Sequence, residues 1–311
     1  MRIMIWMTGL MVAGVVLADD AKTNAPLPLA SAVTNVAVTN VVAKLAMATN
    51  GPVATPSLLV ASPDPQVGKV LMGLATYLQA AKTFRCSVSF RINSEMEGMK
   101  QEISAVYALA AERTNRLSLR YVKGMTGNTV VCNGKKLIIY APGLNRFEER
   151  DAPKSFEQLA EGVGPMAGNM LFVDNLLRED IYAAIMEGVM SVTYAGKELV
   201  EGMDCDHIKF VQDQFDWELW VSSGEKPVVV QVLSDMSKSF AAVTGEAASL
   251  PKGMKMTVLN QFSNWVVDGA IPVDTFDFDP PAGARKADSL FEGEDEDAVE
   301  KPAMPVLGEK K

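Results

Sequence analysis

The stretch that decides the fold is Phe84-Arg85-Cys86-Ser87-Val88-Ser89-Phe90-Arg91-Ile92-Asn93, in which every even position is apolar and every odd position is polar. Side chains of a β-strand point alternately to its two faces, so this period of two predicts a half-buried strand. A slip of one residue in its pairing would turn the whole apolar row toward water. The hydrophobic pattern therefore specifies the register.

The same alternation recurs downstream of this strand. Residues 116–121 repeat it, with the apolar members Leu117, Leu119 and Tyr121. Two further apolar runs, 130–132 and 137–140, flank Asn133-Gly134, a dipeptide suited to the positive φ angles of a tight hairpin turn. We therefore expect antiparallel neighbours. An antiparallel sheet with one apolar face has to close on itself or bury that face under another layer.

One part of that layer is predicted just before the first strand. Asp64-Pro65 combines an acidic N-cap with a proline at the first helical position. Apolar residues then recur every three or four positions, as on one side of a helix: Val67, Val70, Leu71, Leu74, Tyr77, Leu78 and Ala81. We expect this helix to pack on the sheet.

Residues 155–187 predict the rest of the layer. They contain three segments with helical spacing, which glycines break into short pieces: 155–161, 165–177 and 179–187. The middle segment is strongly apolar, which indicates a helical cover laid across the sheet. Strands are then predicted again, the last of them bulged: 190–194, 205–210, 215–221, 227–233 and 254–267.

Both ends of the chain differ from this folded part, which we place at 63–290. Residues 1–18 have the basic start, apolar run and small residues of a signal peptide, with cleavage expected after Ala18. An uncleaved membrane anchor is the alternative, but the run is shorter than the roughly 20 residues a spanning helix needs. Residues 19–62 read as a low-complexity flexible linker, with a short β-repeat as the alternative, and 291–311 as an acidic disordered tail.

Composition excludes some function classes. The formal net charge is −9 and no basic stripe is present, so nucleic acid and anionic membrane surfaces are poor candidate partners. The three cysteines, Cys86, Cys132 and Cys205, allow at most one intramolecular disulfide, although export makes a bridge possible. Widely spaced cysteines on strands are more often small buried hydrophobic residues, so the pairing stays open.

Catalytic and metal-binding patterns are weak. His207 is the only histidine, and no serine or cysteine nucleophile signature accompanies it, so we expect a structural or exposed residue. Asp204, Asp206, Asp213 and Asp216 match no calcium-binding loop, and one histidine with three dispersed cysteines lacks the spacing of a zinc site. We therefore expect no enzyme, no metal and no cofactor.

Several short motifs in order resemble the DUF2092 family of predicted periplasmic proteins, over about residues 67–289. They are Tyr77-Leu78-Gln79-Ala80-Ala81, Arg113-Thr114-Asn115-Arg116-Leu117, Asn133-Gly134-Lys135-Lys136-Leu137, Tyr182-Ala183-Ala184-Ile185-Met186, Asp216-Trp217-Glu218-Leu219-Trp220 and Pro280-Pro281-Ala282-Gly283-Ala284. That family is similar in fold to the lipoprotein carriers LolA and LolB and to the lipid-binding lipoprotein LppX. The resemblance implies an α+β fold: a strongly curved antiparallel sheet, an incomplete barrel, with helices covering its concave face and an apolar cavity between.

The apolar residues of sheet and cover are the candidate ligand site. Methionines are soft and repack easily around irregular apolar ligands; the cover carries several, together with Phe172, and Met190 follows at the start of the next predicted strand. The predicted lining is Phe84, Val88, Phe90, Leu117, Leu119, Tyr121, Met166, Met170, Leu171 and Met186. The alternative is that these side chains simply fill a core.

The expected function is therefore a periplasmic carrier or binding protein for a lipid or for the acyl chain of a lipoprotein. The alternative is a non-catalytic envelope interaction or stress-sensing module with a fully packed core, whose partner is an envelope protein. An enzyme comes third.

Overall fold

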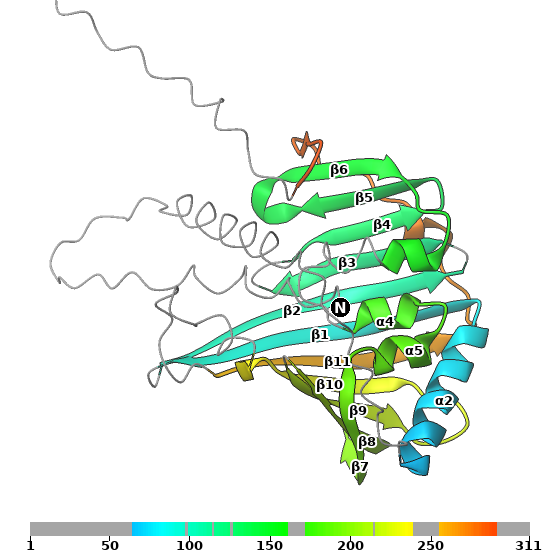
Figure 1. Cartoon of the computed structure of the whole chain (residues 1–311). Coiled ribbons are helices and arrows are strands. Elements are labelled where there is room, and N and C mark those ends of the chain that lie inside the picture. The colour runs from blue at the N-terminus through cyan, green and yellow to red at the C-terminus, as the bar shows by residue number, and fades with distance from the viewer. Residues whose placement is uncertain are drawn as a thin grey trace, which may run out of the picture.

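A computed structural model of the chain describes residues 64–96, 99–113, 115–124, 127–160, 172–213, 215–238 and 255–290. Within these ranges the strands form a 12-stranded sheet in the order β12-β6-β5-β4-β3-β2-β1-β11-β10-β9-β8-β7. All neighbours are antiparallel except β12 and β6, which are parallel. The predicted antiparallel sheet is therefore confirmed, and Figure 1 shows it with helices lying over one face.

The strands form two runs along the chain, separated by short helices. The first run is β1 Thr83–Met96, β2 Met99–Glu112, β3 Arg116–Gly124, β4 Thr129–Asn133, β5 Lys136–Ala141 and β6 Arg146–Asp151. The second is β7 Val189–Val200, β8 Met203–Gln212, β9 Asp216–Ser222, β10 Val229–Asp235, β11 Lys255–Val267 and β12 Arg285–Lys286. β1 pairs with β11, so the first and second runs meet in the middle of the sheet.

Helix α2, Pro65–Ala80, begins where its sequence predicts. The side chain of Asp64 accepts a hydrogen bond of 2.8 Å from the backbone N–H of Gln66, and Pro65 needs no such partner because it lacks an N–H. The buried residues of the apolar stripe are Val67, Leu71, Leu74, Leu78 and Ala81, while Val70 and Tyr77 pack at its border. These residues turn one side of α2 toward the sheet.

The remaining helices are short. Residues 156–160 are helical, α4 spans Val173–Leu177 and α5 spans Ile181–Met186. The side chain of Asp180 caps α5 by accepting a hydrogen bond from the backbone N–H of Ala183 at 2.9 Å. Two 3₁₀ turns, η2 Pro142–Leu144 and η3 Val273–Phe276, lie in loops.

Two local irregularities follow from particular residues. Asn133 and Gly134 form the β4–β5 turn: Gly134 has a φ of 88°, and Asn133 accepts hydrogen bonds from the backbone N–H groups of Lys135 and Lys136, each at 2.9 Å. The predicted bulge in β11 is also present, since its register against β1 shifts between Arg85 and Ser87.

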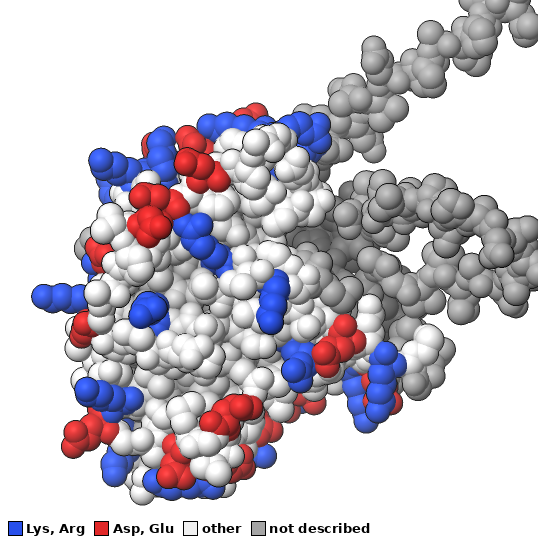
Figure 2. Space-filling view, turned by 180° about the vertical axis from the view of Figure 1, so that it is seen from behind, with Lys and Arg blue, Asp and Glu red and all other residues white. Residues whose placement is uncertain are grey.

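We call the helix-covered side of the sheet the inner face, because α2, α4 and α5 share one hydrophobic cluster with its residues. The opposite side is the outer face, which Figure 2 shows with charged side chains of both signs interspersed. Here the segment after β11 crosses the sheet: Phe276 is buried, and the guanidinium of Arg116 lies 4.3 Å from its ring centre. The sequence did not predict β12, which ends this segment beside β6.

The expected signal peptide, linker and acidic tail lie outside the described residues. Among the helices that the structure describes, none has the length and apolar character to cross a membrane.

Candidate functional site

The predicted lining residues of the sheet come together on the inner face. Phe84, Val88 and Phe90 of β1 are buried there, and β3 adds Leu117 and Leu119, which are fully buried. They share a face because alternate residues of a strand point the same way. Tyr121 is half-buried at the border of the same cluster, where its ring meets that of Tyr107 edge-on at 6.0 Å.

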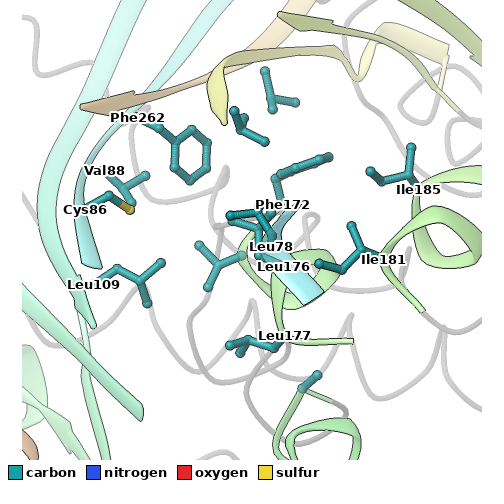
Figure 3. Packing of buried hydrophobic residues seen from close by; sticks show 14 of the residues in the cluster. Leu78, Cys86, Val88, Leu109, Phe172, Leu176, Leu177, Ile181, Ile185 and Phe262 are labelled. Carbon is teal, nitrogen blue, oxygen red and sulfur yellow. The ribbon is translucent and has the colours of Figure 1, made fainter. Parts of the chain in front are cut away.

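The helices place a second apolar surface opposite these strands. Its residues are Leu78 of α2, Phe172, Leu176 and Leu177 at α4, and Ile181 and Ile185 of α5. In Figure 3, Cys86, Val88 and Leu109 point from the sheet toward this helical side. The two surfaces together form what we call the apolar layer.

The outcome for the predicted methionines is mixed. Met186, at the end of α5, is partly buried and packs against the apolar layer. Met190 does not belong to it: its side chain is 48% exposed, because it follows the first residue of β7 and points away from the cluster that buries Val189. Met166, Met170 and Leu171 lie outside the described residues, so their place in the lining stays a prediction.

Sequence reasoning did not include the second half of the sheet in the lining. β8 and β9 contribute Phe210 and Trp217, whose rings stack at 3.8 Å with an angle of 4° between their planes. Phe172 approaches the Trp217 ring at 5.9 Å and the ring of Phe262 from β11 at 6.4 Å. Trp217, Leu219 and Val221 recur at every second position, and this pattern could have predicted that Trp217 lies on the inner face.

Three polar side chains are buried in or beside the apolar layer without full hydrogen bonding. Among the described residues, no partner is present for the amide atoms of Asn260, for Nε1 of Trp217 or for Oδ1 of Asp174. Burial raises the pKa of the Asp174 carboxyl to about 6, against an opposing effect of Arg178. The layer is therefore apolar with a few isolated polar groups.

His207 lies on the outer face, away from this layer. Its Nε2 is 2.6 Å from Oε2 of Glu218 and its Nδ1 is 3.0 Å from Oε1 of Glu198, and the ring stacks on Trp220 at 4.2 Å. We expected either a structural or an exposed histidine. His207 is 3% exposed, so it is a structural one. Both ring nitrogens face carboxylates, and neither is directed at a hydroxyl or a thiol.

The three cysteines are free and buried. Burial raises the pKa of the Cys86 thiol well above its ordinary value and that of Cys205 to about 11, so both stay protonated and unreactive. Cys86 and Cys132 belong to the apolar layer, whereas Cys205 packs with Trp220 and Val230 on the outer face. No group of three or more potential metal ligands occurs in the part of the chain that the structure describes.

Solved structures with a similar fold have low sequence identity. The chain is similar to an uncharacterised conserved protein from Thermus thermophilus, with 9% identity, a TM-score of 0.40, and coverage of 71% of this chain and 98% of that chain. It is similar to lipoprotein LppX from Mycobacterium tuberculosis, with 10% identity, a TM-score of 0.35 and coverage of 68% and 100%. It is also similar to a LolA superfamily protein from Nitrosomonas europaea, with 12% identity, a TM-score of 0.28, and coverage of 67% of this chain and 96% of that chain.

No match to a curated protein was found. A family model described as "Predicted periplasmic protein (DUF2092)" matches residues 68–290, the range that holds the sheet, α2 and the short helices. The chain therefore belongs to the DUF2092 family of predicted periplasmic proteins.

Proposed function

We propose that this protein is a periplasmic carrier or binding protein that holds a lipid, or the acyl chain of a lipoprotein, in the apolar layer between sheet and helices. The observation that carries the proposal is that layer: its sheet side runs from Leu137 of β5 to Phe210 of β8, and its helical side includes two very short helices. An acyl chain needs a long apolar surface and no catalytic group.

The extent of the layer favours a curved sheet. Strands lie about 4.8 Å apart, so the nine strands from β5 to β8 would span about 40 Å in a flat sheet. Residues from β5 through to β8 nevertheless belong to a single cluster with three helices. We therefore include in the proposal the incomplete barrel with helices on its concave side that the family resemblance implies.

The short helices provide the means of exchange. α4 has 5 residues and α5 has 6, lengths at which a helix has little stability of its own and depends on side-chain packing. Contacts of Leu176, Ile181 and Ile185 with the sheet are apolar, so an acyl chain can replace them with contacts of the same kind. Each buried methylene contributes about 0.8 kcal/mol, so ten of them would contribute about 8 kcal/mol before the cost of moving the helices.

Catalysis has no part in the proposal. The paired carboxylates of Glu198 and Glu218 engage both nitrogens of His207, and this group is separated from the apolar layer by the sheet. Export to the periplasm rests on the family description and on the signal peptide expected at residues 1–18.

A non-catalytic interaction or stress-sensing module is the second candidate. It is favoured by α2, where Val67, Leu71, Leu74 and Leu78 have no exposed surface, as in a core that is packed throughout. In that case an envelope protein would be the partner, bound at the surface.

Native mass spectrometry of the protein isolated from its own envelope distinguishes the two candidates. We expect a mass increment that organic extraction removes and that fragments as a lipid. Protein that carries no lipid from the envelope, and takes up none on incubation with a total lipid extract, would refute the carrier and leave the interaction module.

A further inference from the structure

The tryptophans of the described chain differ in how their indole N–H groups are used. Trp265 donates to the backbone carbonyl of Val229 at 2.8 Å, and Trp220 donates to Oε2 of Glu198 at 2.8 Å. Trp217 is 6% exposed, and its Nε1 finds no acceptor among the described residues. A buried indole N–H normally has a partner, so Trp217 is the exception that needs an explanation.

Asn260 has the same feature on the same face. It is 1% exposed, and neither its amide nitrogen nor its amide oxygen has a hydrogen-bond partner in the described structure. It occupies an apolar position of β11, between Val258 and Phe262, and its cross-strand neighbours are Phe90 and Val232. A leucine would fill such a position without leaving polar atoms unpaired.

The sheet brings the two residues to one part of the apolar layer. Trp217 on β9 is paired with Ser234 of β10, and Asn260 on β11 is paired with Val232 of β10, the next inner-face residue along that strand. Phe172 at the start of α4 contacts the rings of both Trp217 and Phe262, the neighbour of Asn260 on β11. Both polar groups therefore border the patch that Phe172 covers.

We infer that Trp217 and Asn260 bind the polar, uncharged head of an acyl ligand, an acylglycerol ester with a free hydroxyl. The indole N–H only donates, so it requires an oxygen acceptor such as an ester carbonyl. The amide of Asn260 donates to a second oxygen and accepts from a hydroxyl. This inference rests on the proposed carrier function and specifies which lipids it selects.

The surrounding residues explain why the head is uncharged. The inner-face side chains of β9, β10 and β11 around these two residues carry no charge: Leu219, Val221, Val232, Ser234, Val258 and Phe262. A carboxylate or phosphate placed here would find no compensating cation among these side chains of β9, β10 and β11, and its transfer costs far more than that of an ester. The site therefore discriminates against fatty-acid anions and phospholipid head groups.

The test measures displacement of a fluorescent lipid from purified full-length protein by monopalmitoylglycerol, methyl palmitate and palmitate, which share one acyl chain. The wild type is expected to bind monopalmitoylglycerol most tightly and palmitate most weakly. Asn260→Leu is expected to lower the affinity for monopalmitoylglycerol about tenfold and the affinity for methyl palmitate by less. Trp217→Phe is expected to lower the affinities for both esters about equally. Gln261→Leu, which removes an amide from the outer face of the same strand, serves as the control and leaves all three affinities unchanged.

A stability measurement on ligand-free protein gives a second readout. Asn260→Leu is expected to raise the midpoint of urea unfolding, because it removes two unpaired polar atoms from an apolar position. A wild type that binds the three lipids equally, with both variants unchanged, would overturn the head-group site but leave the carrier function intact. A lower unfolding midpoint for Asn260→Leu than for the wild type would also overturn the head-group site. A wild type that binds none of the lipids would overturn both the head-group site and the carrier function.

Discussion

Arg113, which follows β2, donates a hydrogen bond of 3.3 Å from Nη2 to the backbone carbonyl of Leu78 in the last turn of α2. Its Nε donates to the carbonyl of Ala81 at 3.2 Å, and its guanidinium lies 5.1 Å from the centre of the Phe156 ring. Carbonyls at the end of a helix lack partners within the helix. One side chain therefore joins α2, the sheet and the helical residues 156–160.

Replacing this arginine should loosen one end of α2. We expect Arg113→Ala to lower the free energy of unfolding by about 1–3 kcal/mol, because two helix-end carbonyls lose their donors. Hydrogen exchange should quicken at the end of α2, and urea unfolding measures the total loss. The exposed Arg85 of β1 provides the control, since Arg85→Ala should change stability by less than about 0.5 kcal/mol. Equal losses in the two variants would show that the contacts with α2 contribute nothing.

The buried carboxyl of Asp174 should make the free energy of unfolding depend on pH. Burial raises its pKa in the folded protein to about 6, above its value of 3.8 in an unfolded chain, so the folded state holds the proton more tightly. The stability that this group contributes is complete below about pH 4 and is lost as the pH rises to about 6, a change on the order of 3 kcal/mol. Asp174→Asn should abolish that part of the pH profile, measured by urea unfolding between pH 4 and 7. The exposed Asp279→Asn should leave it in place, and a profile unaffected by Asp174→Asn would contradict the assignment.

Replacing His207 should lower the stability of the protein without reducing its lipid content. In His207→Gln, Glu198 and Glu218 lose the ring that lies between them, and we expect unfolding to become easier by about 1.5–3 kcal/mol. Lys209→Gln removes only an exposed ion pair with Glu218 at 3.4 Å and should cost less than about 1 kcal/mol. Because His207 is on the outer face, the lipid content of folded protein should match the wild type in both variants. Folded His207→Gln protein devoid of lipid would mean that the outer face takes part in binding.

Replacing Ile185 of α5 should speed the release of a bound lipid. This side chain is fully buried, and Ile185→Ala should lower the free energy of unfolding by about 2–5 kcal/mol. Since α5 depends on this packing, transfer of a labelled lipid to vesicles should also become faster. Ala183→Ser alters the exposed side of the same helix and should change neither quantity. Transfer at the wild-type rate in destabilised Ile185→Ala protein would contradict a role for α5 in exchange.

The sheet could be predicted because its residues carry local signals. Alternation in residues 84–93, the Asn133-Gly134 turn and the Asp64-Pro65 cap each specify backbone geometry within a few residues, and the structure confirms all three. β12 was missed because it has 2 residues and depends on Arg146 and Phe147, more than a hundred positions away. A pairing of that kind leaves no periodic pattern.

The candidate site could be predicted only in part, for a related reason. Phe84 and Leu119 were assigned to the inner face from strand parity, which is a local property. The parity of Trp217 and Asn260 was equally readable, but whether their polar atoms find partners depends on side chains from other strands and helices. Met190 was assigned to the lining because it is a methionine, but it follows buried Val189 in β7 and its side chain points away from the apolar layer.

The most direct test of the apolar layer uses two tryptophans on opposite faces of β9. Trp217 belongs to the apolar layer, and Trp220 belongs to the small cluster on the outer face. In each of two variants one of them is kept and the other three tryptophans of the chain are replaced by phenylalanine. Each variant is then loaded with a lipid whose acyl chain carries bromine, which quenches indole fluorescence on contact, at a concentration high enough to offset the weaker binding expected of Trp217→Phe, and bound lipid is confirmed in both. The account predicts strong quenching of Trp217 and none of Trp220, whereas quenching of Trp220 alone, or of neither in protein shown to contain the lipid, would contradict it.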